Sequence, residues 1–138
     1  MQNPQCVVIL DFGAQYTQLI ARRVRECGVF SVVLPCTTAL DDIRAYEPRG
    51  LILSGGPSCI LDADAPRCDA GIYELGVPIL GICYGMQLTS VLLGGDAGAC
   101  SLREYGRVQM TVDKRDSGLM EGLDEQSYCW MSHTYQVL

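Results

Sequence analysis

The sequence predicts an α/β protein with an open, mostly parallel sheet and helices on both of its faces. Two observations support this prediction. Short apolar runs alternate four times with helical patterns, and each run is apolar along nearly its whole length. A strand without a polar face has to be buried on both sides, and parallel sheets achieve this through their crossover helices. The expected architecture is therefore a series of strand–helix units.

The first unit begins with a predicted strand over residues 6–10, a run of five apolar residues. After the turn Asp11-Phe12-Gly13, a helix is expected over residues 15–26, with Gly28 at the C-cap position. The apolar stripe expected to face the sheet consists of Tyr16, Leu19, Ile20, Val24 and Cys27.

The next two units are bounded by prolines and glycines. Pro35 ends a second predicted strand over residues 29–34, and a short helix over residues 40–46 stops before Pro48. A third strand, residues 50–53, leads into Ser54-Gly55-Gly56-Pro57.

The fourth unit and the region after it differ in pattern. Asp64 is expected to cap a helix that contains Pro66 in its first turn and ends at Gly76. A fourth strand over 77–82 and a helix over 84–93 follow. The expected elements after Gly95 are a half-exposed antiparallel strand through Val108, Met110 and Val112, and a further strand over residues 128–131.

Composition narrows the class of protein. A chain of 138 residues with 49% hydrophobic residues is expected to form one domain with an ample core. Ten basic and 16 acidic residues give a net charge of −6, which argues against a nucleic-acid surface. No apolar run approaches the ~20 residues of a membrane span, and residues 1–10 lack the pattern of a secretory signal. We therefore expect a cytoplasmic protein without nucleic-acid or membrane partners.

The eight cysteines do not form a metal-binding or disulfide pattern. The sequence contains no C-x-x-C pair, and its one histidine is His133, so no metal site is expected. Without an export signal, most of these thiols are expected to be reduced and to act as ordinary apolar residues. Cys83 is the exception.

Cys83 occupies the centre of Gly81-Ile82-Cys83-Tyr84-Gly85, the G-x-nucleophile-x-G spacing of a nucleophile elbow. Such a turn places the side chain at a helix N-terminus, where the helix dipole favours the thiolate that can attack a carbonyl carbon. The N–H of Tyr84 and the glycine-rich loop after the third strand would then bind the oxyanion. A flavin or nucleotide phosphate site is the rival interpretation, weakened because neither G-x-G-x-x-G nor G-x-x-x-x-G-K-[ST] occurs.

Four segments resemble one family. Residues 77–87, VPILGICYGMQ, resemble the nucleophile segment of class I glutamine amidotransferases. Residues 10–26, 52–57 (ILSGGP) and 130–133 (WMSH) resemble the amidotransferase domain of the GMP synthase (glutamine-hydrolysing) type. The resemblance runs from about Val7 to the last residue, and it implies a flavodoxin-like fold.

The resemblance also implies a role for each matching residue. Cys83 would be the nucleophile that attacks the side-chain amide of glutamine, and Gly56 and Tyr84 would supply the oxyanion N–H groups. The residues that would bind the substrate glutamine are Gly55, Gln87, Ser132 and His133.

The partner implied by the resemblance is an ATP-pyrophosphatase (synthetase) domain or subunit, which would use the ammonia to convert XMP to GMP. ATP and Mg²⁺ would belong to that portion, which nothing in these residues resembles, and no cofactor is expected in residues 1–138. The resemblance also allows a homodimer of the full enzyme.

Two departures from the family pattern stand out. Thr134-Tyr135 replaces the usual Gly-Asp after Ser-His. The family's cysteine also works with a histidine and a glutamate in an H-x-E arrangement, whereas position 135 here is tyrosine. His133 is therefore a poor substitute for the catalytic base. We expect residues 1–138 to be a single, incomplete amidotransferase domain that is inactive or weak by itself.

Two alternatives belong to other functional classes. A cysteine-elbow hydrolase of the same fold would turn over peptide or aldehyde substrates and ignore glutamine. A non-catalytic, truncated binding or interaction module would expose an open sheet edge prone to association.

Overall fold

The computed structural model describes residues 5–138, without the side chains of residues 100–104 and 134–135. The chain divides into two compact units. The first comprises the described residues up to Gly98 together with Val137–Leu138, and the second comprises Ala99–Gln136. The side chains of Cys100, Thr134 and Tyr135, discussed above, lie outside the described residues. The single domain expected over residues 1–138 stays a prediction.

The first unit is built on a four-stranded sheet in the order β2-β1-β3-β4, with all three neighbouring pairs parallel. The strands are β1 (Cys6–Asp11), β2 (Phe30–Pro35), β3 (Gly50–Leu53) and β4 (Ile79–Gly81). The predicted parallel sheet is confirmed. The strand order reverses between β1 and β3, and the loops after such neighbouring strands commonly bind ligands.

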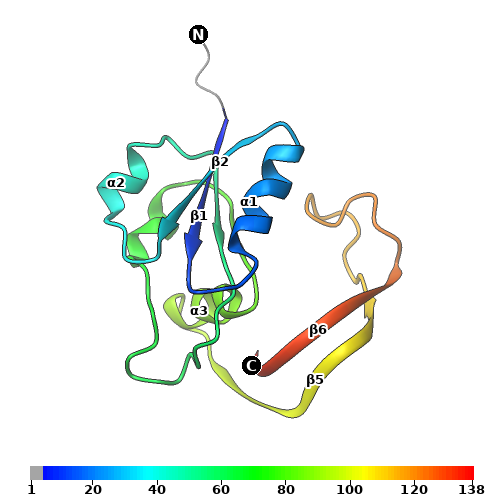
Figure 1. The fold of residues 1–138 in the computed structure, drawn as a ribbon. Helices are drawn as coiled ribbons and strands as arrows, with labels where there is room; N and C mark the ends of the chain where they lie inside the picture. The colour runs from blue at the N-terminus through cyan, green and yellow to red at the C-terminus, as the bar shows by residue number, and fades with distance from the viewer. Residues whose placement is uncertain (1–4) are drawn as a thin grey trace. The chain divides into compact units, whose positions relative to one another are not determined.

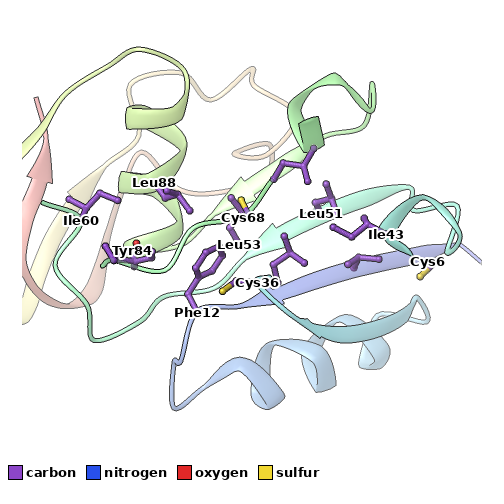
Figure 2. Close-up of a cluster of buried hydrophobic side chains, with 14 residues drawn as sticks. Cys6, Phe12, Cys36, Ile43, Leu51, Leu53, Ile60, Cys68, Tyr84 and Leu88 are labelled. Carbon is purple, nitrogen blue, oxygen red and sulfur yellow. The ribbon is translucent and has the colours of Figure 1, made fainter. Parts of the chain in front are cut away.

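Helices cover both faces of this sheet, as predicted (Figure 1). α1 (Thr17–Glu26) packs on one face, where the Ser31 hydroxyl of β2 donates to the Ala21 carbonyl at 2.9 Å. The opposite face forms the main hydrophobic core with α2 (Leu40–Arg44), the 3₁₀ helix η1 (Ala70–Glu74) and α3 (Tyr84–Leu92). Fully buried members of this core are Val8, Leu10 and Ile72. Others, labelled in Figure 2, are Leu51, Leu53, Ile43 and Leu88.

The buried face of α1 differs from the predicted stripe. Thr17 and Ala21 are the buried residues of the helix, whereas Tyr16, Leu19 and Cys27 are exposed. Thr17 and Ala21 lie four residues apart on one side of the helix, and their small size lets the backbone approach β2 closely. Ile20 and Val24 of the predicted stripe are half-buried on this same side, so the predicted face was right for these two residues and wrong for Tyr16, Leu19 and Cys27.

The helix expected from Asp64 to Gly76 is reduced to η1. Proline disfavours the helical conformation in the residue before it, which opposes a helix that runs from Ala65 into Pro66. The Pro66 carbonyl accepts a hydrogen bond from the Tyr84 hydroxyl, which occupies an acceptor that a helix would use. Asp69 instead begins η1, and its carboxylate accepts from the Gly71 N–H at 2.8 Å.

The second unit contains most of a two-stranded sheet formed by β5 (Ala97–Thr111) and β6 (Gln126–Val137). Both predicted strands are present and longer than expected. The side-chain amide of Gln109 donates to the side-chain oxygen of Gln126, and the Val112 N–H donates to the Glu125 carbonyl. A later residue of the first segment thus bonds to an earlier residue of the second, so the two segments run in opposite directions. The predicted antiparallel arrangement is therefore observed. No helix among the described residues is both long and apolar enough to span a membrane.

Candidate active site

The predicted elbow and the glycine-rich loop meet the turn Asp11-Phe12-Gly13 at the carboxyl ends of β1, β3 and β4. A Cβ added to Gly13, in the loop after β1, would lie 3.4 Å from Pro57 Cδ in the loop after β3. A Cβ added to Gly55 would lie 3.3 Å from the Cys83 Cβ. The loop after β3 therefore lies between the other two.

Asp11 shapes the loop after β1. Its Oδ1 accepts from the Gly13 N–H at 2.8 Å and from the Thr17 hydroxyl at 3.0 Å. One carboxylate oxygen thus ties the turn to the first residue of α1, which is the role that Asp commonly takes in turns. An aspartate two residues before a glycine is the sequence signal for this turn.

Cys83 has the strained backbone of a nucleophile elbow. Its φ of 53° and ψ of −112° are unusual for a residue with a side chain, and its side chain is exposed. Cys83 is also the N-cap of α3, and its carbonyl accepts from the N–H groups of Met86 and Gln87 at 3.1 Å. The sulfur thus lies where the helix dipole favours negative charge.

Glycines on either side of Cys83 make this tight turn sterically feasible. A Cβ added to Gly81 would lie 2.7 Å from Met86 Cα and N, and one added to Gly85 would lie 2.4 Å from the Leu53 carbonyl oxygen. Neither distance is tolerable for a side chain, so α3 could not pack this closely on β3 and β4 with any other residue at these two positions.

Gly56 is equally constrained, because a Cβ there would lie 2.3 Å from the Phe12 carbonyl oxygen. The sequence identified Gly55 and Gly56 as residues of the site, and the structure places their loop against the elbow. Their assigned roles, glutamine binding for Gly55 and oxyanion binding for Gly56, stay predictions.

Tyr84 follows Cys83 and has a buried side chain. Its ring centroid lies 5.5 Å from that of Phe12 (Figure 2). Its hydroxyl donates to the Pro66 carbonyl. Burial raises the pKa of the Tyr84 phenol, so it stays protonated as a donor. The side chain fixes the start of α3, which leaves the backbone N–H as the group predicted to bind an oxyanion.

The remaining predicted residues fall in both units. Gln87 lies in the first turn of α3 and is buried. Ser132 and His133 lie on β6 in the second unit, where Ser132 is exposed and His133 is half-buried. Their roles in binding glutamine stay predictions.

Two contributors were not identified from the sequence as individual residues. Ser54 is fully buried, and its hydroxyl bonds to the loops after β1 and β3. Pro66 supplies the carbonyl that holds Tyr84. Pro66 gave no signal, because its use depends on a tertiary contact 18 residues along the chain.

The described side chains contain no group of three or more His, Cys, Asp or Glu that could hold a metal ion. The chemistry that the arrangement offers is nucleophilic: an exposed sulfur at a helix N-terminus beside a glycine-rich loop. Such a sulfur can attack an electrophilic carbon and form a covalent intermediate.

Comparison with known protein families matches residues 8–138 to "Glutamine amidotransferase class-I". The GMP synthase [glutamine-hydrolyzing] of Ruminiclostridium cellulolyticum is 53% identical over 135 residues, which are 98% of this chain and 26% of that protein. The enzyme of the same name from Latilactobacillus sakei is 50% identical over 137 residues, which are 99% of this chain and 26% of that protein. The chain thus spans about a quarter of the length of these curated relatives.

Solved structures show the same fold. A Thermoplasma acidophilum protein described as part of a GMP synthase superposes with a TM-score of 0.83 at 26% identity, covering 100% of this chain and 69% of that one. A glutamine amidotransferase of Thermotoga maritima gives a TM-score of 0.69 at 14% identity, covering 96% of this chain and 62% of that one. The flavodoxin-like fold implied by the motifs agrees with these structures.

Proposed function

The chain belongs to the class I glutamine amidotransferase family, and on this premise we propose that it is the glutamine-hydrolysing domain of a GMP synthase, with Cys83 as its nucleophile. The observation that carries the proposal is the backbone of Cys83, which holds an exposed sulfur at the N-terminus of α3 beside Gly55. The high identity to the GMP synthases over nearly the whole chain supports the type of amidotransferase.

In the proposed reaction, the Cys83 thiolate attacks the side-chain amide carbon of glutamine and a carbon–sulfur bond forms. The N–H groups of Gly56 and Tyr84 stabilise the oxyanion. The carbon–nitrogen bond then breaks, the leaving nitrogen takes a proton, and ammonia departs. Water cleaves the resulting glutamyl thioester and releases glutamate.

Proton transfer in this scheme needs a base that these residues do not provide. The 138 residues hold one histidine, His133, and no H-x-E arrangement. We propose that a histidine and a glutamate outside these residues complete the site, and that residues 1–138 alone release ammonia weakly or not at all. Cys83 can still undergo reactions that require no proton transfer from that base.

The proposal assigns the ammonia to an ATP-pyrophosphatase domain or subunit that aminates XMP to GMP in the cytoplasm. ATP and Mg²⁺ would act in that portion, with no cofactor in residues 1–138. The names of the relatives support this assignment, since they are glutamine-hydrolysing GMP synthases.

Covalent labelling with a diazoketone analogue of glutamine, 6-diazo-5-oxo-L-norleucine, tests the proposed nucleophile and substrate. The diazo carbon would take a proton from water, and the Cys83 sulfur would then bond to that carbon with loss of dinitrogen. We expect mass spectrometry to find one label, on the peptide containing Cys83, and glutamine to slow the labelling. Cys83→Ala should abolish it.

The matched control is the diazoketone one carbon shorter, an asparagine analogue, which should label Cys83 much more slowly. Equal labelling by both analogues, with no protection by glutamine, would contradict a glutamine site. Turnover of peptide or aldehyde substrates alongside that result would favour the cysteine-elbow hydrolase.

A further inference from the structure

Ser54 connects all three loops of the candidate site. Its side chain is 0% exposed at the carboxyl end of β3. Its hydroxyl accepts from the Phe12 N–H at 2.9 Å and donates to the Gly55 carbonyl at 2.8 Å. Its backbone N–H donates to the Leu10 carbonyl, and its carbonyl accepts from the Gly85 N–H, both at 3.1 Å. The hydrogen bonds of this one residue thus join β1, the loop after β3 and the elbow.

The bond from the Ser54 hydroxyl to the Gly55 carbonyl fixes a peptide plane. The Gly55 carbonyl and the Gly56 N–H belong to the same peptide, which is planar and trans, so the two groups point in opposite directions. Holding the carbonyl therefore also sets the direction of the Gly56 N–H. Two adjacent glycines leave the dihedrals on both sides of this peptide unusually free, so the peptide needs an anchor.

An oxyanion donor is effective only if it already points at the position where charge develops. We propose that Ser54 is a positioning residue for thioester formation, whose hydroxyl locks the Gly55–Gly56 peptide and thereby aims the Gly56 N–H at the oxyanion. This inference rests on the proposed function, because it takes Cys83 as the nucleophile and Gly56 as a donor. The Phe12 N–H on the same hydroxyl oxygen holds the hydroxyl in place.

Two reactions of Cys83 separate this role from a merely structural one. With the γ-(4-nitrophenyl) ester of L-glutamate, the sulfur attacks the ester carbonyl, an oxyanion forms, and the carbon–oxygen bond breaks. Nitrophenolate leaves with the electron pair, so no added proton is needed. With iodoacetamide, the sulfur displaces iodide from a tetrahedral carbon and no oxyanion forms. The ratio of the two rates therefore reports on the oxyanion donors.

The experiment measures both rates at Cys83 in the 138-residue chain, with the rate of Cys83→Ala subtracted. We expect Ser54→Ala to lower the first-order acylation rate at saturating ester by about tenfold or more, because misaligned donors lose transition-state stabilisation. The alkylation rate should stay within about twofold of the parent, and the ester concentration at half-saturation should change little, because ground-state binding is retained.

Ser31→Ala is the matched control. Ser31 is another fully buried serine of the same sheet, and its hydroxyl also donates to a carbonyl, that of Ala21 at 2.9 Å. Its loss should cost comparable stability and leave the acylation-to-alkylation ratio unchanged. If Ser54→Ala does not fold, Ser54→Cys keeps a side chain of the same shape and slightly larger size while weakening both hydrogen bonds, and peptide mapping still follows Cys83 alone.

The outcomes distinguish this inference from the proposed function. A parent chain that the ester does not acylate above the Cys83→Ala background overturns the proposed function together with this inference. A second outcome is that the parent chain is acylated as expected while the acylation-to-alkylation ratio is the same in the parent, the Ser54 variant and Ser31→Ala. That result overturns the role of Ser54 alone. A reduced ratio confined to the Ser54 variant supports it.

Discussion

Gly56 has less steric freedom than Gly55, its neighbour in the loop after β3. A Cβ there would meet the Phe12 carbonyl oxygen at 2.3 Å, a backbone atom that cannot move aside cheaply. We expect Gly56→Ala to lower the free energy of unfolding by about 1–3 kcal/mol, because the loop has to shift. The shift would also displace the Gly56 N–H, so acylation of Cys83 by the γ-(4-nitrophenyl) ester of L-glutamate should slow.

Gly50→Ala is the control for this substitution. A Cβ at Gly50 would lie 3.5 Å from the Pro78 carbonyl oxygen, an ordinary contact. Urea unfolding should show a free energy that is unchanged or raised by up to about 1 kcal/mol, since alanine restricts the unfolded chain. Equal stability of the two variants would contradict the steric argument at Gly56.

At the residue scale, local spacing predicted the strained turn at Cys83 better than the contacts that surround it. The G-x-C-x-G pattern identified Cys83 and its strained turn because the elbow is a local structure whose glycines have a steric cause. The hydroxyl of Ser54 bonds to Phe12, 42 residues earlier in the chain, and such a contact leaves no periodic signal. Ser132 and His133 were identified only by resemblance, and their role stays a prediction.

At the element scale, the strands were predictable because their apolar runs are nearly uninterrupted. A continuous apolar run requires no choice of a buried face, whereas in a helix one side has to be assigned as buried. In α1 the large apolar residue Leu19 is exposed, as is Tyr16 just before the helix, and Thr17 and Ala21 are buried. Hydrophobicity alone missed Thr17 and Ala21 because close approach to β2 requires small side chains.

A pair of substitutions in α1 tests which side of the helix carries stability. Ala21 is 1% exposed and its carbonyl accepts from Ser31, so Ala21→Leu should lower the free energy of unfolding by about 1–3 kcal/mol through overpacking. Leu19 is 46% exposed, so Leu19→Ala should change it by no more than about 0.5 kcal/mol. Circular dichroism at about 222 nm during urea unfolding measures both. A larger effect at Leu19 than at Ala21 would restore the predicted stripe.

At the scale of the whole molecule, the core of the first unit contains protonated groups that resist ionisation. Burial raises the pKa of the Cys6, Cys36, Tyr73 and Tyr84 side chains, and it raises that of Cys68 from 9.0 to about 11. These groups belong to the core beneath the site or pack against it. Because all of these pKa values are raised, the free energy of unfolding depends on pH in the alkaline range.

The sign follows from proton binding. Between the ordinary pKa of a thiol and the raised value of Cys68, the unfolded chain has lost protons that the folded chain retains. Unfolding therefore releases protons, and the free energy of unfolding falls as the pH rises. The stabilisation is fully present below about pH 9 and is lost progressively toward about pH 11.

Urea unfolding at several values between about pH 7.5 and about pH 11, with a non-thiol reductant present, measures this slope. We expect the free energy of unfolding to decline steadily above about pH 9, and Cys68→Ala to make the decline shallower because one titrating group is removed. Comparing slopes rather than absolute stabilities cancels the cavity that the substitution creates. Cys27, an exposed cysteine, provides the control, and Cys27→Ala should keep the parent slope. A flat profile, or a Cys68→Ala slope equal to that of the parent, would show that the buried thiol does not couple folding to pH.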